Sequence, residues 1–168
     1  MPPSIEGGLG DAGIRALDAF VRGGETVVAL NQSARFASGS ILEVTTDTVH
    51  PVMAGMPERA KIFFDGSPAF ATLEGFEGVA LARYAKEGSP LLSGYLLGEK
   101  YLQSAAAALD VKHGRGRVVL IGFRPQWRGQ TVGTFRVVFN AALYGREVAE
   151  KSKPTAGFWT TLRTAAPQ

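Results

Sequence analysis

The spacing of apolar and polar residues changes most sharply between residues 113 and 145, where it predicts a strand, a polar loop and a helix in succession. Residues 117–123 are an almost unbroken aliphatic and β-branched run, which is typical of a short strand buried on both faces. Gly114 and Gly116 punctuate the start of this strand and predict a tight turn. From residue 131 the apolar period becomes 3.6, so we expect a helix over residues 131–148. The apolar face of this helix consists of Phe135, Val138, Phe139 and Ala142.

A helix and a strand are also predicted near the N-terminus. Asp11 is the expected N-cap of a helix that runs to Arg22, and Gly23 with Gly24 ends it. The apolar face of this helix consists of Ile14, Leu17, Phe20 and Val21. Residues 26–31 then have the sequence TVVALN, a short apolar run that indicates a strand of the parallel type.

The middle of the chain predicts further strands, separated by turns that contain Gly and Pro. These strands are expected at residues 40–45, 61–65, 79–84, 91–97 and 104–111. We therefore predict one α/β domain over residues 1–148, with a mixed sheet that has a parallel core, an antiparallel extension and flanking helices. A polar C-terminal tail is expected at residues 149–168, anchored in part by Phe158 and Trp159.

Composition narrows the class of protein without naming a function. The 168 residues are 45% apolar and 20% charged, which is typical of a globular domain rather than of a disordered chain. The net charge of +3 comes from 18 basic and 15 acidic residues scattered along the chain, so we expect no nucleic-acid partner. No apolar run reaches the about eighteen residues that span a bilayer, and we expect no membrane partner. Because the chain has no cysteine, disulfides, thiolate metal sites and a cysteine nucleophile are excluded.

The polar loop after the 117–123 strand is the best candidate for a ligand site. It contains Arg124, Gln126, Trp127, Arg128 and Gln130, directly before the predicted helix. In open α/β sheets, ligands bind where a strand ends and a helix N-terminus begins. The two arginines would fork onto a carboxylate or phosphate, the glutamines would add hydrogen bonds, and the tryptophan would offer a flat wall. Alternatively, the arginines pair with acidic neighbours and the tryptophan fills the gap between helix and sheet.

A second candidate lies at the end of the 26–31 strand, where Asn31 and Ser33 begin a polar cluster. The simpler interpretation is that these residues cap the strand and turn the chain. No G-x-S-x-G motif is present, so Ser33 is the one plausible hydroxyl nucleophile at a strand end. His50 and His113 have no acidic partner at ligand spacing, and we expect no metal site or cofactor in this chain.

Five segments, taken in order, resemble a known domain. These are GGLGDAGIRALDAFVRGGETVVALNQSARFA, GSILEV, HPVMAGMPERAKIFF, LLSGYLLGEKYL and GRGRVVLIGFRPQWRGQTVGTFRVVFNAALY. They are similar to the glutamine amidotransferase-like domain that follows the catalytic domain in many bacterial zinc carboxypeptidases, and they cover most of residues 2–145. The resemblance implies a flavodoxin-like fold related to class I amidotransferases.

The resemblance also implies a partner and a location. The partner would be a peptidase catalytic domain that carries the zinc ion, in the same or a parent chain, and the parent enzyme would be periplasmic or secreted. No catalytic residue carries over to this chain, since neither the zinc ligands nor the amidotransferase cysteine has a counterpart. In the family a strand and helix precede the PPSIEGGLG-like lead-in, and a longer segment precedes the equivalent of Gly39. We therefore expect a fragment whose exposed sheet edge favours a homodimer.

Three functions follow as expectations. The first is a non-catalytic accessory or binding domain of a zinc carboxypeptidase-like protein. The second is a divergent hydrolase or amidotransferase relative that uses residues near 31–35 and 124–130, with Ser33 as the nucleophile. The third is a stand-alone module that binds a small anion or a sugar acid through Arg124 and Arg128.

Overall fold

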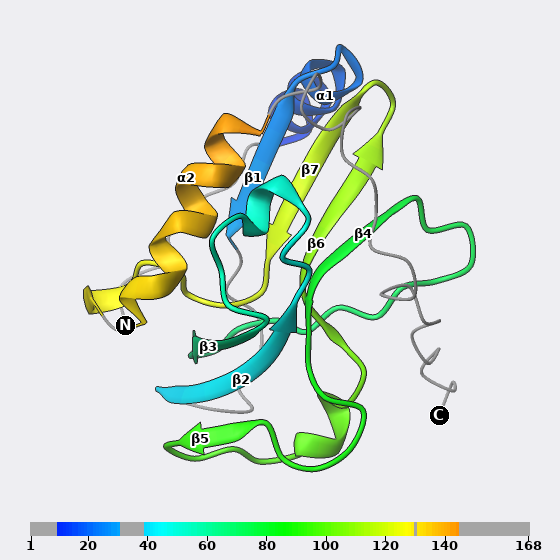
Figure 1. The fold of residues 1–168 in the computed structure, drawn as a ribbon. Coiled ribbons are helices and arrows are strands. Elements are labelled where there is room, and N and C mark those ends of the chain that lie inside the picture. Colours follow the sequence, from blue (N-terminus) through cyan, green and yellow to red (C-terminus); the bar gives the residue numbers. More distant parts are fainter. Residues whose placement is uncertain (1–9, 31–38, 130, 145–168) are drawn as a thin grey trace, which may run out of the picture.

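A computed structural model describes residues 10–30, 39–129 and 131–144, and strands are its main regular elements (Figure 1). The two helices of this part are α1 (Gly10–Arg22) and α2 (Phe135–Leu143). The strands are β1 (Thr26–Leu30), β2 (Ser40–Thr46), β3 (Arg59–Phe64), β4 (Gly78–Arg83), β5 (Leu91–Ser93), β6 (Ala106–His113) and β7 (Gly116–Ile121). Neither described helix is long and apolar enough to cross a membrane.

The seven strands form one sheet in the order β1-β7-β6-β4-β2-β3, with β5 paired to β2. β1 and β7 are parallel, and the other pairs are antiparallel. The register of β4 against β6 shifts between Ala80 and Arg83, and such irregularities bend a sheet. β4 meets β2 through two residue pairs, and the sheet curls there, so that β2, β3 and β5 turn away from the β1–β7–β6 part (Figure 1).

The predicted flavodoxin-like, class I amidotransferase-like α/β fold is wrong. A doubly wound fold needs a parallel core with a crossover helix for each strand pair, whereas the described sheet has one parallel pair. The physical reason is that no α-helix is described between β2 and β7 to serve as a crossover for parallel strands, and β6 and β7 are joined by a two-residue turn, which can connect antiparallel neighbours alone. The result is a curled, half-barrel-like mixed sheet with two described helices (Figure 1).

The β6–β7 hairpin shows how glycines position this sheet. His113 pairs with Gly116 across a two-residue turn, and Gly114 has the positive φ of 62° that the turn requires. Gly116 serves another purpose, because a Cβ there would overlap the carbonyl oxygens of Val21 and Glu25. The end of α1 and the start of β1 therefore lie directly against β7.

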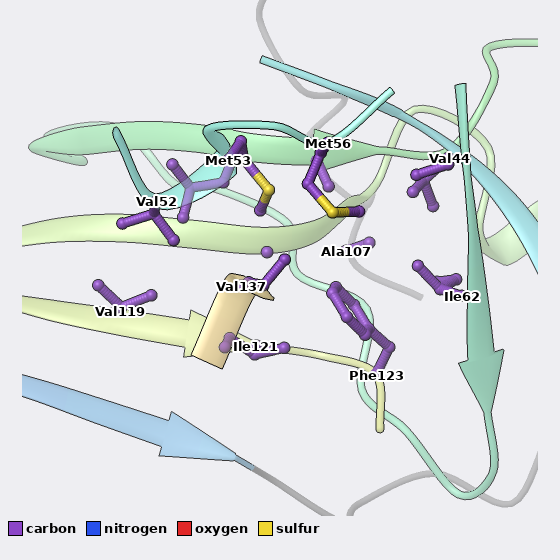
Figure 2. Close-up of a cluster of buried hydrophobic side chains, with 14 of the residues drawn as sticks. Val44, Val52, Met53, Met56, Ile62, Ala107, Val119, Ile121, Phe123 and Val137 are labelled. Carbon is purple, nitrogen blue, oxygen red and sulfur yellow. The ribbon is translucent and has the colours of Figure 1, made fainter. Parts of the chain in front are cut away.

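The main core lies between the sheet, α2 and the turn at Pro51–Met53. Val137 and Ala141 of α2 are fully buried, as are Val52 and Met53 of the turn. Figure 2 shows Val137 beside Ile121 and Phe123, with Met53 and Met56 on the opposite side of the cluster. Val119 and Ile121 face this core, whereas Val118 and Leu120 on the other face of β7 are half-buried. The sequence predicts that β7 is buried on both faces, but only the face with Val119 and Ile121 is fully buried.

Both helices present predicted apolar residues to solvent. In α2 the buried residues are Val137 and Ala141, so the predicted face is wrong: Phe139 is 65% exposed and Ala142 is also exposed. In α1, Val21 is buried, while Ile14, Leu17 and Phe20 are exposed. α1 begins at Gly10, so Asp11 lies in its first turn rather than before it.

The other predicted elements agree in place and differ in length. The last turn before α2 is a 3₁₀ segment, Val132–Thr134, so the α-helix is shorter than the predicted 131–148. β5 is also shorter than the predicted strand at 91–97. The predicted tail at 149–168, with Phe158 and Trp159, lies outside the described residues.

Candidate functional site

Arg124, the first residue of the predicted ligand loop, is held by its neighbours at the end of β7. Its backbone N–H donates to the Phe63 carbonyl at 2.9 Å. Its Nε donates to the Asp65 carbonyl at 3.1 Å, and its Nη2 forms an ion pair with Asp65 Oδ2 at 3.1 Å. The guanidinium carbon lies 4.4 Å from the centre of the Trp127 ring, a cation–π contact. Arg124 thus has the acidic partner that the alternative interpretation of this loop required.

Among the described residues, Trp127 is the predicted site residue that lies against Arg124. Gln126 is exposed, and Trp127 is 38% exposed, so it lies at the surface over Arg124. The side chain of Arg128 and the residues Gln130, Asn31 and Ser33 lie outside the described part. Within the described residues, an anion at this loop would have to compete with Asp65 for Arg124.

A buried polar centre, defined by His50, Asp110, Arg117 and Tyr144, brings together four distant segments. Asp110 Oδ2 accepts from the Tyr144 hydroxyl at 2.8 Å and from Arg117 Nη1 at 3.0 Å, and lies 3.3 Å from His50 Nε2. The Tyr144 hydroxyl is 3.2 Å from His50 Nε2, and the two rings are tilted against each other. β6, β7, the segment before Pro51 and the end of α2 are therefore joined at one carboxylate oxygen.

Burial controls the electrostatics of this polar centre. Asp110 is 0% exposed, Tyr144 2% and His50 4%, and Arg117 reaches toward solvent. His50 Nδ1 accepts the Val52 backbone N–H at 3.2 Å, so the ring proton belongs on Nε2, facing Asp110 and Tyr144. Burial, followed by the Asp110 carboxylate, raises the pKa of the Tyr144 hydroxyl above its ordinary value. Asp110 Oδ1 has no hydrogen-bond partner among the described residues.

The imidazole, carboxylate and phenol of this polar centre are buried and hydrogen-bonded to one another. It has an imidazole and a carboxylate, but no serine, cysteine or lysine is part of it. No group of three metal-binding side chains occurs in the described ranges.

Sequence spacing missed both histidine–aspartate pairs. His50 meets Asp110, and His113 Nε2 lies 2.6 Å from Asp18 Oδ1 at the surface, where it links β6 to α1. His113 first and Arg22 second lower the pKa of the exposed Asp18 carboxyl. The partners are 60 and 95 residues apart in sequence, so local spacing carried no signal for either pair.

A groove of about 460 Å³ lies beside β3 and faces the turn at residues 131–134. Most of its lining is apolar, with two cationic side chains from β3. The lining residues are Ile41, Met56, Pro57, Arg59, Ala60, Lys61, Thr131, Gly133 and Thr134. Thr131 has a positive φ of 51°, which is unusual for a β-branched residue. The sequence did not predict this groove, since three separate segments form it.

Comparisons with known proteins give no assignment. No protein-family model and no curated protein matches the chain. Among solved structures, a β-galactosidase from Rahnella sp. R3 is 15% identical with a TM-score of 0.43, over 79% of this chain and 20% of that enzyme. A β-galactosidase from Bacillus circulans sp. alkalophilus is 11% identical with a TM-score of 0.38, over 83% of this chain and 21% of that enzyme. This chain thus spans about a fifth of their length, and at these scores their activity does not transfer to it.

Proposed function

We propose that this chain is a non-catalytic accessory domain of a larger, zinc carboxypeptidase-like protein, and that it acts by binding. The observation that supports this role most is the burial of the polar centre. Its imidazole, carboxylate and phenol are the groups an enzyme would use for proton transfer, yet each is enclosed and engaged with the others. The surface, rather than this centre, is then the place where the domain acts.

The identity of the larger protein is proposed from the sequence resemblance. Five segments in order are similar to the accessory domain that follows the catalytic domain of bacterial zinc carboxypeptidases. The partner would be that catalytic domain, and zinc would be bound there rather than by this chain. A periplasmic or secreted location would follow from the same resemblance.

The intact mass of the protein purified from its native source, with zinc measured on the same sample, tests the proposal. We expect a mass well above the 17.8 kDa of this chain and bound zinc. A native species near 17.8 kDa without zinc would refute the link to a peptidase.

Hydrolysis assays test the non-catalytic part separately. We expect the 168-residue chain to hydrolyse neither chromogenic esters nor C-terminal dipeptide substrates above the buffer rate. Turnover that is lost in Ser33→Ala would instead establish the hydrolase alternative.

A further inference from the structure

The outer edge of β3 has unpaired backbone groups. β3 ends the strand order, and the Thr46 N–H donates to the Glu58 carbonyl, so the even-numbered residues of this segment pair with β2. The N–H and C=O groups of Arg59 and Lys61 must then point outward. No hydrogen bond from another described residue reaches them, whereas the next outward carbonyl, that of Phe63, accepts from Arg124 N–H. An extended chain can add to such an edge.

The 460 Å³ groove runs beside this same stretch of β3. Met56, Pro57 and Ala60 give it an apolar wall, and the turn at residues 131–134 closes the opposite side. A groove of this size and lining has room for a bulky aliphatic or aromatic side chain. Backbone pairing and an apolar anchor are thus available at the same place, which is how peptides are bound by strand addition.

The charges at this edge favour an acidic partner. Arg59 is hydrogen-bonded to Glu43, and Lys61 is exposed, with no ion-pair partner among the described residues. Arg136 adds a third cation beside the groove, where it donates to the Gly55 carbonyl. Against these three cations stand two carboxylates, Glu43 and Glu58, so the edge has a net positive charge.

The same charges argue against a second copy of this chain at this edge. Two antiparallel β3 strands would place the Arg59 and Lys61 side chains of one copy opposite or diagonal to those of the other, which is repulsive. A cationic edge of this kind prevents self-association while it remains open to an anionic strand.

We infer that the β3 edge and its groove bind an extended, acidic peptide segment that carries one bulky apolar residue. The segment pairs its backbone with Arg59 and Lys61, inserts the apolar side chain between Met56 and Gly133, and places a carboxylate near the Lys61 ammonium. This inference rests on the proposed accessory role and names the kind of partner surface that the domain would hold.

Titration of the ¹⁵N-labelled full chain with the peptide acetyl-AELEA-amide, followed by NMR, tests the inference. We expect saturable shifts of the Arg59, Lys61 and Gly133 amide signals, because the peptide alternates two glutamates with one central leucine. The reversed-charge peptide acetyl-AKLKA-amide is expected to bind at least about tenfold more weakly. Absence of saturable shifts at these residues, or equal binding of the two peptides, would overturn the inference.

Two variants test the contributions of the groove and of the charge to peptide binding separately. Gly133 has open space around its Cβ position and lies in the groove lining, so Gly133→Phe is expected to fill the groove and abolish binding without loss of fold. If Gly133→Phe unfolds, the comparison of Lys61→Glu with Lys86→Glu still tests the inference. Lys61→Glu should weaken binding of the acidic peptide at least about tenfold. Lys86→Glu, outside the groove lining, should leave the affinity unchanged. Equal affinity in Lys61→Glu and Lys86→Glu would contradict the inferred carboxylate contact.

The outcomes distinguish this inference from the proposed function. If the native protein has a mass of 17.8 kDa, contains no zinc and binds the peptide, the inferred peptide site is supported and the proposed peptidase parent is refuted. If the native protein is large and contains zinc but its accessory domain does not bind the peptide, the proposed peptidase parent is supported and the inferred peptide site is refuted. Line broadening that grows with protein concentration, in place of peptide-dependent shifts, would show that a second copy occupies the edge and would overturn the inference.

Discussion

The hydroxyl of Tyr144 lies between the imidazole of His50 and the carboxylate of Asp110, at the point where α2 ends. The hydroxyl of Tyr84 is also buried, but it has no hydrogen-bond partner among the described residues. Two tyrosines with the same chemistry therefore have opposite energetic roles. Loss of a buried hydroxyl that is paired leaves its partners unsatisfied, whereas loss of an unpaired one removes a desolvation penalty.

Tyr144→Phe is expected to lower the free energy of unfolding by about 1–3 kcal/mol, because His50 and Asp110 lose a buried partner. Tyr84→Phe is expected to raise it by about 1 kcal/mol, because the ring stays and the unsatisfied hydroxyl goes. Urea unfolding followed by circular dichroism measures both values. A destabilised Tyr84→Phe would contradict this assignment and would mean that a bound water satisfies the Tyr84 hydroxyl.

The side-chain partners that local sequence does not reveal are those distant in the chain. Sequence spacing leaves His50 and His113 without acidic partners, yet each lies against an aspartate in the structure. For the Arg124 loop, the sequence does predict an acidic partner as one of two interpretations, and Asp65 is that partner. The type of residue indicates that a partner is needed, but the partner itself depends on how the strands are ordered in the sheet.

At the scale of elements, periodicity located α1, α2 and β7 and gave the wrong inward face for α2. The stripe formed by Phe135, Val138, Phe139 and Ala142 is strongly apolar, yet the sheet buries Val137 and Ala141. Small and medium side chains at 137 and 141 allow α2 to approach the sheet closely, and Asn140 donates to the carbonyls of Val52 and Ala54 beside them. That hydrogen bonding fixes the rotation of α2 about its axis, and a hydropathy pattern does not contain it.

Gly116→Ala tests the contact between the β6–β7 hairpin and α1. We expect a loss of about 1–3 kcal/mol of unfolding free energy, because the new Cβ would overlap the carbonyl oxygens of Val21 and Glu25. Gly133→Ala is the matched control, since nothing lies within 4 Å of its added Cβ, and its effect should stay within about 0.5 kcal/mol. Thermal and urea unfolding of the two variants measure the difference. Equal stabilities would show that α1 does not lie against β7 in solution.

At the scale of the whole molecule, the sequence predicted a mixed sheet and overestimated its parallel part. Strand positions follow from apolar runs and turn residues, so most of them were located. Strand direction follows from which strands become neighbours, and this is decided by contacts such as those of β1 with β7, far apart in the chain. The groove beside β3 could not be predicted for the same reason.

The stability of the whole molecule should decrease above pH 10. Burial raises the pKa of the Tyr84 hydroxyl, and burial together with Asp110 raises that of Tyr144, whereas tyrosine in the unfolded chain ionises near 10.0. Above that pH the unfolded chain loses protons that the folded chain keeps, so the unfolded state becomes favoured. The contribution of each buried hydroxyl to the free energy of unfolding is complete below pH 10. Above pH 10 it declines by about 1.4 kcal/mol per pH unit.

Urea midpoints between pH 8 and pH 11.5 measure this decline. The double variant Tyr84→Phe with Tyr144→Phe should have a shallower alkaline slope than the wild type. Tyr95→Phe, at an exposed tyrosine, should keep the wild-type slope. If the double variant and the wild type decline in parallel, other groups cause the alkaline loss.

The parallel pairing of β1 with β7 also has a consequence for the time course of folding. β6 and β7 are joined by a two-residue turn and can form a hairpin as soon as both exist, within about microseconds. β1, which is synthesised long before β7, has no other described strand beside it and must wait for β7 to be made. During synthesis β1 therefore stays without its described strand partner until β7 has left the ribosome. Closure of this long-range pair is a late and slow step, because the loop between Leu30 and Arg117 that it closes is about half of the chain.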